Sequence, residues 1–113
     1  MFELKTEIWA SALIRRAGIA GAFAGVTRKG DTDAGAVLVK VATLDGKARL
    51  YTPARNGDGD RIWLDLSSGS LGDAEADVDA YVRKRADKDP DLWVIEIEDK
   101  QGRHFLLEPV DEG

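Results

Sequence analysis

Between residues 93 and 98 the chain alternates apolar and polar side chains, which is the period of a half-buried β-strand. Trp93, Ile95 and Ile97 fall on one face of such a strand, and Glu96 and Glu98 fall on the other. The alternation therefore predicts a strand with its apolar side against the core.

A second strand is expected at residues 103–107, and the loop between the two decides their register. A four-residue loop would place Ile97 opposite His104, whereas a three-residue loop with a left-handed Gly102 places Ile97 opposite Phe105. We favour the second register because it separates apolar from polar side chains. In this register the core positions are Trp93, Ile95, Ile97, Phe105 and Leu107. The outward positions are Glu96, Glu98 and His104. Asp99 is paired with Arg103.

Another hairpin is predicted where residues 36–44 and 47–53 flank Asp45 and Gly46, a dipeptide typical of a type I′ turn. A two-residue loop places Val41 opposite Leu50 and puts Tyr51 on the other face, beside Lys40. Both faces then carry apolar side chains, which favours a central position in the sheet. Further strands are expected at residues 22–29 and 61–66.

Two segments have the spacing of helices. The first covers residues 7–17, with Thr6 as its N-cap, and the second covers about residues 74–88, with Asp73 as its N-cap. Pro90 cannot continue the second helix. The apolar stripe of that helix consists of Ala74, Val78, Tyr81 and Val82.

These elements predict an α+β fold in the order α-β-β-β-β-α-β-β. We expect a largely antiparallel sheet of about six strands with the two helices packed on it, forming a single domain over residues 1–113. A chain of 113 residues with 43% apolar content can build one core of this size.

The composition excludes several kinds of chemistry. The chain has no cysteine and one histidine, so disulfides, thiolate metal sites, a cysteine nucleophile and histidine-rich metal sites are all excluded. We expect no cofactor, since no cofactor fingerprint is present. No apolar run is long enough for a membrane span and the N-terminal residues do not read as a signal peptide, so a cytoplasmic location is expected.

Charge is divided unevenly along the chain, whose net charge is −5. Residues 1–56 hold nine basic and five acidic side chains, and residues 57–113 hold seven basic and sixteen acidic ones. Either the two halves neutralise each other on packing, or the first half presents a basic face to an acidic partner. Nucleic acid is the less favoured partner because phosphate binding requires many uncompensated cations.

Two acidic motifs fail as metal sites. Asp91 and Glu98 match part of a nuclease-like pattern, but on one strand their α-carbons would lie roughly 23 Å apart. Residues 56–60 have oxygen donors at alternate positions, as the start of a calcium loop does. The sixth and twelfth positions of that loop would be Arg61 and Ser67 instead of glycine and an acid. We therefore expect no metal site.

Six residues are candidates for a binding site: Arg15, Arg16, Trp63, Glu96, Glu98 and His104. The two arginines end the first helix, where they favour its dipole, and Arg16 is expected to border the core. Arg16 could pair with a carboxylate of the acidic half or contribute to an anion site. Glu98 opposite His104 could be an acid–base pair, although such a pair across a strand is more often a surface contact.

Three stretches resemble an uncharacterised family of small bacterial proteins, a domain of unknown function. They are Trp9-Ala10-Ser11-Ala12 with Arg15-Arg16; Ala34-Gly35-Ala36-Val37-Leu38-Val39-Lys40-Val41; and Asp89-Pro90-Asp91-Leu92-Trp93 with Glu96-Ile97-Glu98-Asp99. The resemblance implies a bacterial domain that extends over nearly the whole chain. It implies no activity, cofactor or catalytic residue.

The pattern as a whole favours a non-enzymatic interaction or regulatory module of a bacterial cytoplasmic protein. It would bind an unidentified protein partner, or a second copy of itself, through an exposed sheet edge or through Trp63. The alternative is a small enzyme or anionic-ligand-binding protein that uses Arg15 and Arg16 with Glu96 and Glu98.

Overall fold

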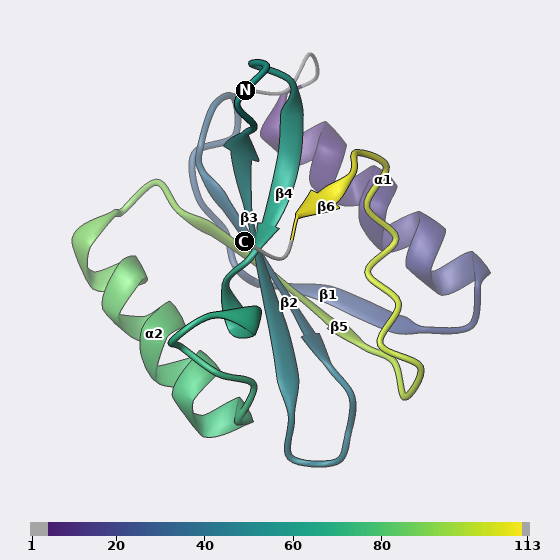
Figure 1. The fold of residues 1–113 in the computed structure, drawn as a ribbon. Coiled ribbons are helices and arrows are strands. Elements are labelled where there is room, and N and C mark those ends of the chain that lie inside the picture. The colour runs from purple at the N-terminus through teal and green to yellow at the C-terminus, as the bar shows by residue number, and fades with distance from the viewer. Residues whose placement is uncertain (1–4, 112–113) are drawn as a thin grey trace.

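The computed structural model describes residues 5–111 and consists of a six-stranded sheet with a long helix on each face (Figure 1). The elements in chain order are α1 (Thr6–Ile19), β1 (Phe23–Arg28), β2 (Val37–Ala42), β3 (Ala48–Arg55), β4 (Arg61–Asp65), the 3-10 turn η1 (Leu66–Ser68), α2 (Glu75–Lys88), β5 (Trp93–Glu98) and β6 (Val110–Asp111). The predicted α+β class and element order are confirmed.

The strands lie in the order β1-β5-β2-β3-β4-β6. Strand β5 is inserted between β1 and β2, antiparallel to the first and parallel to the second. Strand β6 is also parallel to its neighbour β4, while β2, β3 and β4 form an antiparallel meander. The sheet is therefore mixed, but mostly antiparallel as expected.

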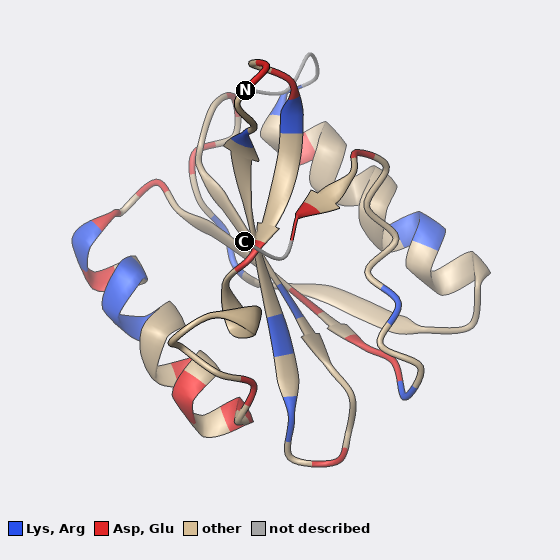
Figure 2. Cartoon of the chain, in the orientation of Figure 1, with Lys and Arg blue, Asp and Glu red and all other residues tan. Residues whose placement is uncertain are grey.

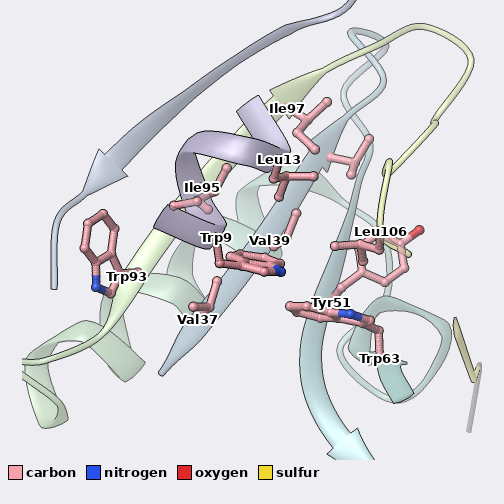
Figure 3. Packing of buried hydrophobic residues seen from close by; sticks show 12 residues of the cluster. Trp9, Leu13, Val37, Val39, Tyr51, Trp63, Trp93, Ile95, Ile97 and Leu106 are labelled. Atoms are coloured by element: carbon pink, nitrogen blue, oxygen red, sulfur yellow. The ribbon is translucent and has the colours of Figure 1, made fainter. Parts of the chain in front are cut away.

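Each face of the sheet packs on one helix. On the α1 face, Trp9 and Leu13 of the helix cover Val39 and Ile95 of the two central strands (Figure 3). On the α2 face, Val78 packs against a second cluster that contains Leu38 and Leu50. Every residue of β2 is buried, which agrees with its predicted central position.

The β2–β3 hairpin has a different register from the predicted one. The loop has three residues, Leu44 to Gly46, and the backbone N–H of Thr43 donates to the carbonyl of Lys47 (3.1 Å). Leu44 and Gly46 both have positive φ angles, of 64° and 85°, so the turn is not a two-residue type I′ turn at Asp45 and Gly46. The extra residue shifts the pairing by one position.

The shift changes which side chains share a face. Val39 lies opposite Tyr51, and Lys40 lies opposite Leu50. The prediction that Tyr51 lies beside Lys40 is therefore wrong. Tyr51 packs in the α1-side core, whereas Lys40 faces α2.

The predicted last hairpin is also wrong. Both edges of β5 are already occupied, by β1 and β2, so residues 103–107 cannot pair with it. They leave the sheet in an irregular segment that contains Gly102 (φ 72°) and Phe105 (φ 59°). Phe105 still packs on the core, but Leu107 is 74% exposed instead of buried. Asp99 and Arg103 do pair, as an ion pair across the turn (2.9 Å).

Neither predicted helix cap forms. Thr6 is the first residue of α1, and its buried hydroxyl donates to the carbonyl of Gly35 (3.3 Å) instead of capping the helix. Helix α2 begins at Glu75 after Ala74, which forms a β-bridge with Lys47 and therefore holds an extended backbone. Tertiary contacts at both sites replace the local side-chain cap.

The segment 89–93 holds β5 in place by packing on the loop of residues 30–35. The indole N–H of Trp93 donates to the carbonyl of Asp31 (2.6 Å), and the N–H of Asp31 donates to the carbonyl of Asp91 (3.1 Å). Gly35 lies so close that an added Cβ would overlap the carbonyl oxygen of Asp91 and reach 2.8 Å from the Trp93 ring. Only glycine fits there.

Gly35→Ala is therefore expected to lower the free energy of unfolding by about 1–3 kcal/mol, the usual range for overpacking. Gly57→Ala is the matched control, since a Cβ at Gly57 would meet no atom within 4 Å. Urea unfolding followed by tryptophan fluorescence measures both variants. Equal midpoints for the two variants would show that the close approach at Gly35 contributes nothing.

Candidate functional site

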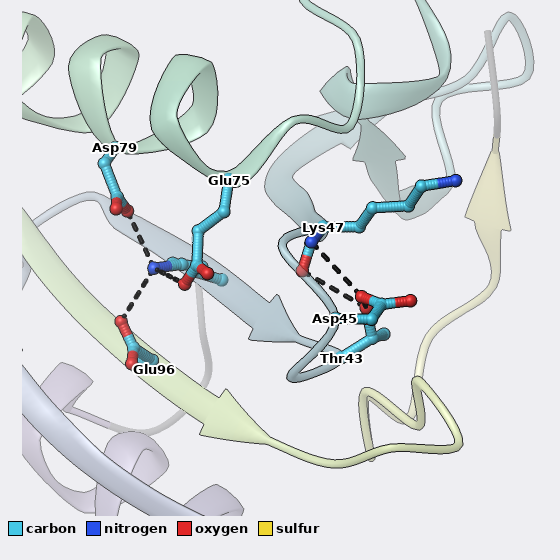
Figure 4. Close-up of polar contacts among 7 residues, drawn as sticks. Thr43, Asp45, Lys47, Glu75, Asp79 and Glu96 are labelled. Carbon is cyan, nitrogen blue, oxygen red and sulfur yellow. Dashed lines mark hydrogen bonds and ion pairs between the residues drawn. The ribbon is translucent and has the colours of Figure 1, made fainter.

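Three ion pairs meet at Lys40, between the sheet and α2; Figure 4 shows the three acidic side chains, Glu75, Asp79 and Glu96, that point toward one another there. The Nζ atom of Lys40 lies 2.7 Å from a carboxylate oxygen of Glu75, 2.7 Å from Asp79 and 3.1 Å from Glu96. Glu75 and Asp79 are one turn apart on α2, so both side chains reach the same point. Glu96 reaches it from β5, where it lies directly beside Lys40. We call these four residues the Lys40 cluster.

The ammonium group of Lys40 is strongly held in its charged form. Burial alone would lower the pKa of Lys40, but the hydrogen bonds to Asp79, Glu75 and Glu96 outweigh burial and raise it well above 10.5. A lysine that stays protonated at neutral pH is neither a nucleophile nor a general base. The Lys40 cluster therefore holds α2 on the sheet and provides no reactive amine.

Sequence reasoning did not find this cluster, although one signal was present. Lys40 is the only charged residue in the fully buried strand β2. A buried lysine requires an acidic partner, and Glu75 and Asp79 have the helical spacing to provide it. The predicted register placed Lys40 beside Tyr51, whereas in the structure it lies beside Leu50.

The structure does not bring Arg15 and Arg16 together with Glu96 and Glu98. Arg16 donates through Nε (3.2 Å) and Nη2 (3.0 Å) to the carbonyl oxygen of Phe105, so it fixes the C-terminal segment against α1. Arg15 is exposed on α1. Glu96 and Glu98 lie on the opposite, α2-facing side of the sheet, where Glu96 binds Lys40.

His104 and Glu98 do not form an acid–base pair, as no ion pair joins them within residues 5–111. The Nδ1 atom of His104 accepts a hydrogen bond from the N–H of Leu106 (2.9 Å), and the ring stands edge-on to Tyr51 at 5.2 Å. Burial lowers the pKa of His104 below 6.5, against an opposing effect of the Asp65 charge. The imidazole is therefore neutral at pH 7 and packs as a structural group.

The pairing of Asp99 with Arg103 is the other strongly coupled contact. The guanidinium donates to the Asp99 carboxylate through Nε (2.9 Å) and Nη2 (3.0 Å), which lowers the pKa of Asp99 to about 2. The same guanidinium lies over the Phe105 ring at 5.2 Å. This contact stabilises the turn after β5 in place of the predicted hairpin.

Trp63 is not an exposed interaction residue, and that prediction is wrong. Its side chain is 1% exposed and stacks on Trp9, with ring centroids 5.4 Å apart and planes at 20° (Figure 3). The indole N–H donates to Oε1 of Glu108 (2.9 Å). Strand β6, which no sequence pattern indicated, lies parallel to β4 beside Trp63.

The edge of the sheet at β1 is open. Phe23 is 70% exposed and Val26 is 42% exposed, and both lie on this outermost strand. Ile19, the last residue of α1, precedes β1 in the sequence and is also exposed. Phe23 and Val26 point to opposite faces of the sheet, so each face has an exposed apolar side chain at this edge. We call this open strand, with the exposed residues Ile19, Phe23 and Val26, the β1 edge.

Metal sites and membrane spans are not found in residues 5–111. No group of three or more histidine, cysteine or acidic side chains is placed to hold an ion there. The loop after Arg55 is an ordinary turn, in which Asn56 accepts from the N–H groups of Asp58 and Asp60 (both 3.0 Å). None of the described helices has the length and apolar character needed to cross a bilayer.

Comparisons with known proteins agree with this architecture. A DUF1491 family protein from Caulobacter crescentus CB15, solved by crystallography, is 55% identical to the chain, with a TM-score of 0.86 over 96% of this chain and 99% of that one. An NMR structure of a DUF1491 family protein from the same organism is 54% identical, with a TM-score of 0.82 over 98% and 99% of the two chains. The solution structure of protein Atu0922 from A. tumefaciens is 32% identical, with a TM-score of 0.73 over 99% and 100%.

Comparison with curated proteins gives no match. The family described as protein of unknown function (DUF1491) matches residues 4–107. That match covers most of the sequence, and the three solved relatives share the fold over nearly their whole length. The chain therefore belongs to the DUF1491 family.

Proposed function

We propose that this chain is a non-enzymatic interaction module of the bacterial cytoplasm, which associates with a second copy of itself through the β1 edge. The observation that carries the proposal is an edge strand whose central residues are uncharged. Edge strands are usually protected from pairing by charges, proline, bulges or short length. The centre of β1, Ala24-Gly25-Val26, has no charge and no proline, and its one irregularity is a register shift between Val26 and Arg28 near the end of the strand.

The sequence of β1 is compatible with pairing to its own copy. If two strands meet antiparallel about a two-fold axis at Gly25, Ala24 of one copy lies opposite Val26 of the other. Phe23 then lies opposite Thr27. No like charges face each other in this register, and the missing side chain at Gly25 lets the backbones approach. A closed dimer of this kind joins the two sheets into one.

The strand at the opposite edge is less suitable. Within the described residues strand β6 spans Val110–Asp111, and one of the two is an acid. A ladder built on these residues is short and carries one acid from each copy. Of the two edges, β1 therefore supports self-association better.

The alternative is an enzyme or anion-binding protein built from Arg15, Arg16, Glu96 and Glu98. Its support is weaker, because Arg16 is engaged by the Phe105 carbonyl and Glu96 by Lys40 on the other side of the sheet. A catalytic site needs such groups to converge beside space for a substrate. We therefore favour the interaction module.

Light scattering of the purified protein at high micromolar concentration tests the proposal. The wild type is expected to have twice the mass of one chain, and Val26→Lys is expected to return it to a single chain, because a charge on an edge strand opposes pairing. Leu107→Lys is the matched control, since Leu107 is an exposed apolar residue (74%) in the C-terminal segment. It is expected to leave the dimer intact.

Two results would overturn self-association through β1. The first is a wild-type protein that remains a single chain at this concentration. The second is a dimer that Val26→Lys leaves unchanged, with circular dichroism verifying that the variant is folded.

A further inference from the structure

An open cavity of about 370 Å³ lies beside the β3–β4 hairpin. It is lined by the apolar residues Pro53, Ala54, Ile62 and Trp63, together with Arg55, Arg61 and Glu108. The volume is within the range of small-ligand pockets, about 300–1,000 Å³, and a mostly apolar lining with few polar groups is typical of them.

The two arginines of this cavity lie directly opposite each other. Arg55 ends β3 and Arg61 begins β4, and their α-carbons are partners across the hairpin. Figure 2 shows the cationic ends of both strands in blue. Like charges in this position repel each other, so the pair lowers stability unless an anion lies between them.

Neither guanidinium is satisfied by a carboxylate among the described residues. Arg55 donates through Nη1 to the carbonyl of Gly59 (2.7 Å), which leaves its other donors for a ligand. The side chain of Arg61 is exposed and makes no hydrogen bond or ion pair within residues 5–111. A planar guanidinium fork is the side-chain group best matched to a carboxylate.

Glu108 determines which ligand charge the cavity favours. It lines the same cavity, and its Oε1 accepts from the indole of Trp63 (2.9 Å), so the carboxylate is fixed there. Two positive groups and one negative group leave the lining with a single net positive charge. That balance suits a monoanion, while a dianion would be repelled by Glu108.

We propose that this cavity binds a small carboxylate with an apolar body. The carboxylate is held by Arg61 and Arg55, and the apolar part packs on Pro53 and Ile62. The site belongs to the β3–β4 side of the sheet, away from β1. Ligand binding and self-association can therefore be tested independently, and the failure of one does not contradict the other.

The experiment uses 3-phenylpropionate as the probe, followed in ¹H–¹⁵N spectra through the indole N–H resonance of Trp63. We expect a saturable shift of that resonance. The uncharged analogue 3-phenylpropan-1-ol is expected to bind roughly tenfold more weakly, since it loses the charge-assisted hydrogen bonds. Acetate, which has the charge without the apolar body, is also expected to bind more weakly.

Two variants are expected to change the affinity for the probe in opposite directions. Arg61→Gln is expected to weaken binding of the probe roughly tenfold. Glu108→Gln keeps an oxygen for the Trp63 indole but removes the negative charge, so it is expected to strengthen binding. Arg83→Gln, an exposed arginine on α2, is the control and is expected to change nothing.

A probe that produces no saturable shift of the Trp63 indole overturns the proposal. Equal binding of the alcohol and the acid also overturns it, since the cavity would then be an apolar site without anion recognition. If Arg61→Gln does not fold, Glu108→Gln decides, and unchanged or weaker binding in that variant contradicts the proposal.

Discussion

Lys40→Ala is expected to lower the free energy of unfolding by about 2–3 kcal/mol, less than the full effect of breaking a buried ion pair because the carboxylates left behind are partly solvated. The reason is that Glu75, Asp79 and Glu96 converge on the ammonium group from α2 and β5. Without the cation, three carboxylates face each other in a partly desolvated gap. Urea unfolding of the purified variant, followed by fluorescence and circular dichroism, measures the loss.

The control is Lys47→Ala, a lysine exposed on the adjacent β2–β3 turn. It is expected to change stability by no more than about 0.5 kcal/mol. Lys40→Met combined with Glu75→Gln, Asp79→Asn and Glu96→Gln removes all the charges and is expected to recover much of the loss. A loss below about 1 kcal/mol for Lys40→Ala would contradict the assigned role of the Lys40 cluster.

The same contact predicts a dependence on alkaline pH. The pKa of Lys40 is raised in the folded state, so its contribution to stability is complete below the ordinary value of 10.5. It is lost as the pH rises above that value, because the unfolded chain releases the proton first. The difference in stability between the wild type and Lys40→Met is therefore expected to be constant near neutral pH and to shrink above pH 10.5.

Periodicity predicted the elements of this fold well, because each depends on neighbouring residues. The alternation of Trp93, Ile95 and Ile97 placed β5 correctly, and the spacing of Val78, Tyr81 and Val82 placed α2. Which strands pair with each other was harder to predict from the sequence. Proximity in sequence favoured a hairpin after β5, whereas the chain places β5 between two earlier strands.

One sequence signal for that central position was present. Val94 lies on the opposite face of β5 from Ile95, and both are buried. A strand that is apolar on both faces is typical of the middle of a sheet. The acids at 96 and 98 obscured this signal, because Glu96 reads as solvent-exposed unless the partner Lys40 is known.

The pairing register of β2 and β3 depends on the backbone conformation of Leu44. Asp45-Gly46 favoured a two-residue turn, but Leu44 adopts a left-handed conformation that non-glycine residues rarely use. The side chain of Asp45 accepts a hydrogen bond from the N–H of Lys47 (3.2 Å), which stabilises the longer loop. That conformation places Leu50, and not Tyr51, beside Lys40.

Trp63→Ala is expected to lower the free energy of unfolding by about 3–5 kcal/mol, the usual range for truncating a buried tryptophan. Trp63 is 1% exposed, stacks on Trp9 of α1 and lies opposite Pro53 of β3. Its removal would leave a cavity where α1, β3 and β4 meet. Chemical unfolding in urea, with the slope compared to verify a two-state transition, gives the value.

Trp63→Phe separates packing from hydrogen bonding. Phenylalanine keeps a ring against Trp9 but loses the indole N–H that donates to Glu108, so a smaller loss of about 1–2 kcal/mol is expected.

The size of the Trp63→Ala effect decides whether Trp63 is a core residue or an exposed interaction residue. An exposed interaction tryptophan would change stability by less than about 0.5 kcal/mol on truncation, because it would leave no cavity. A loss several times larger, with Trp63→Phe between the alanine variant and the wild type, is the result that a core position requires.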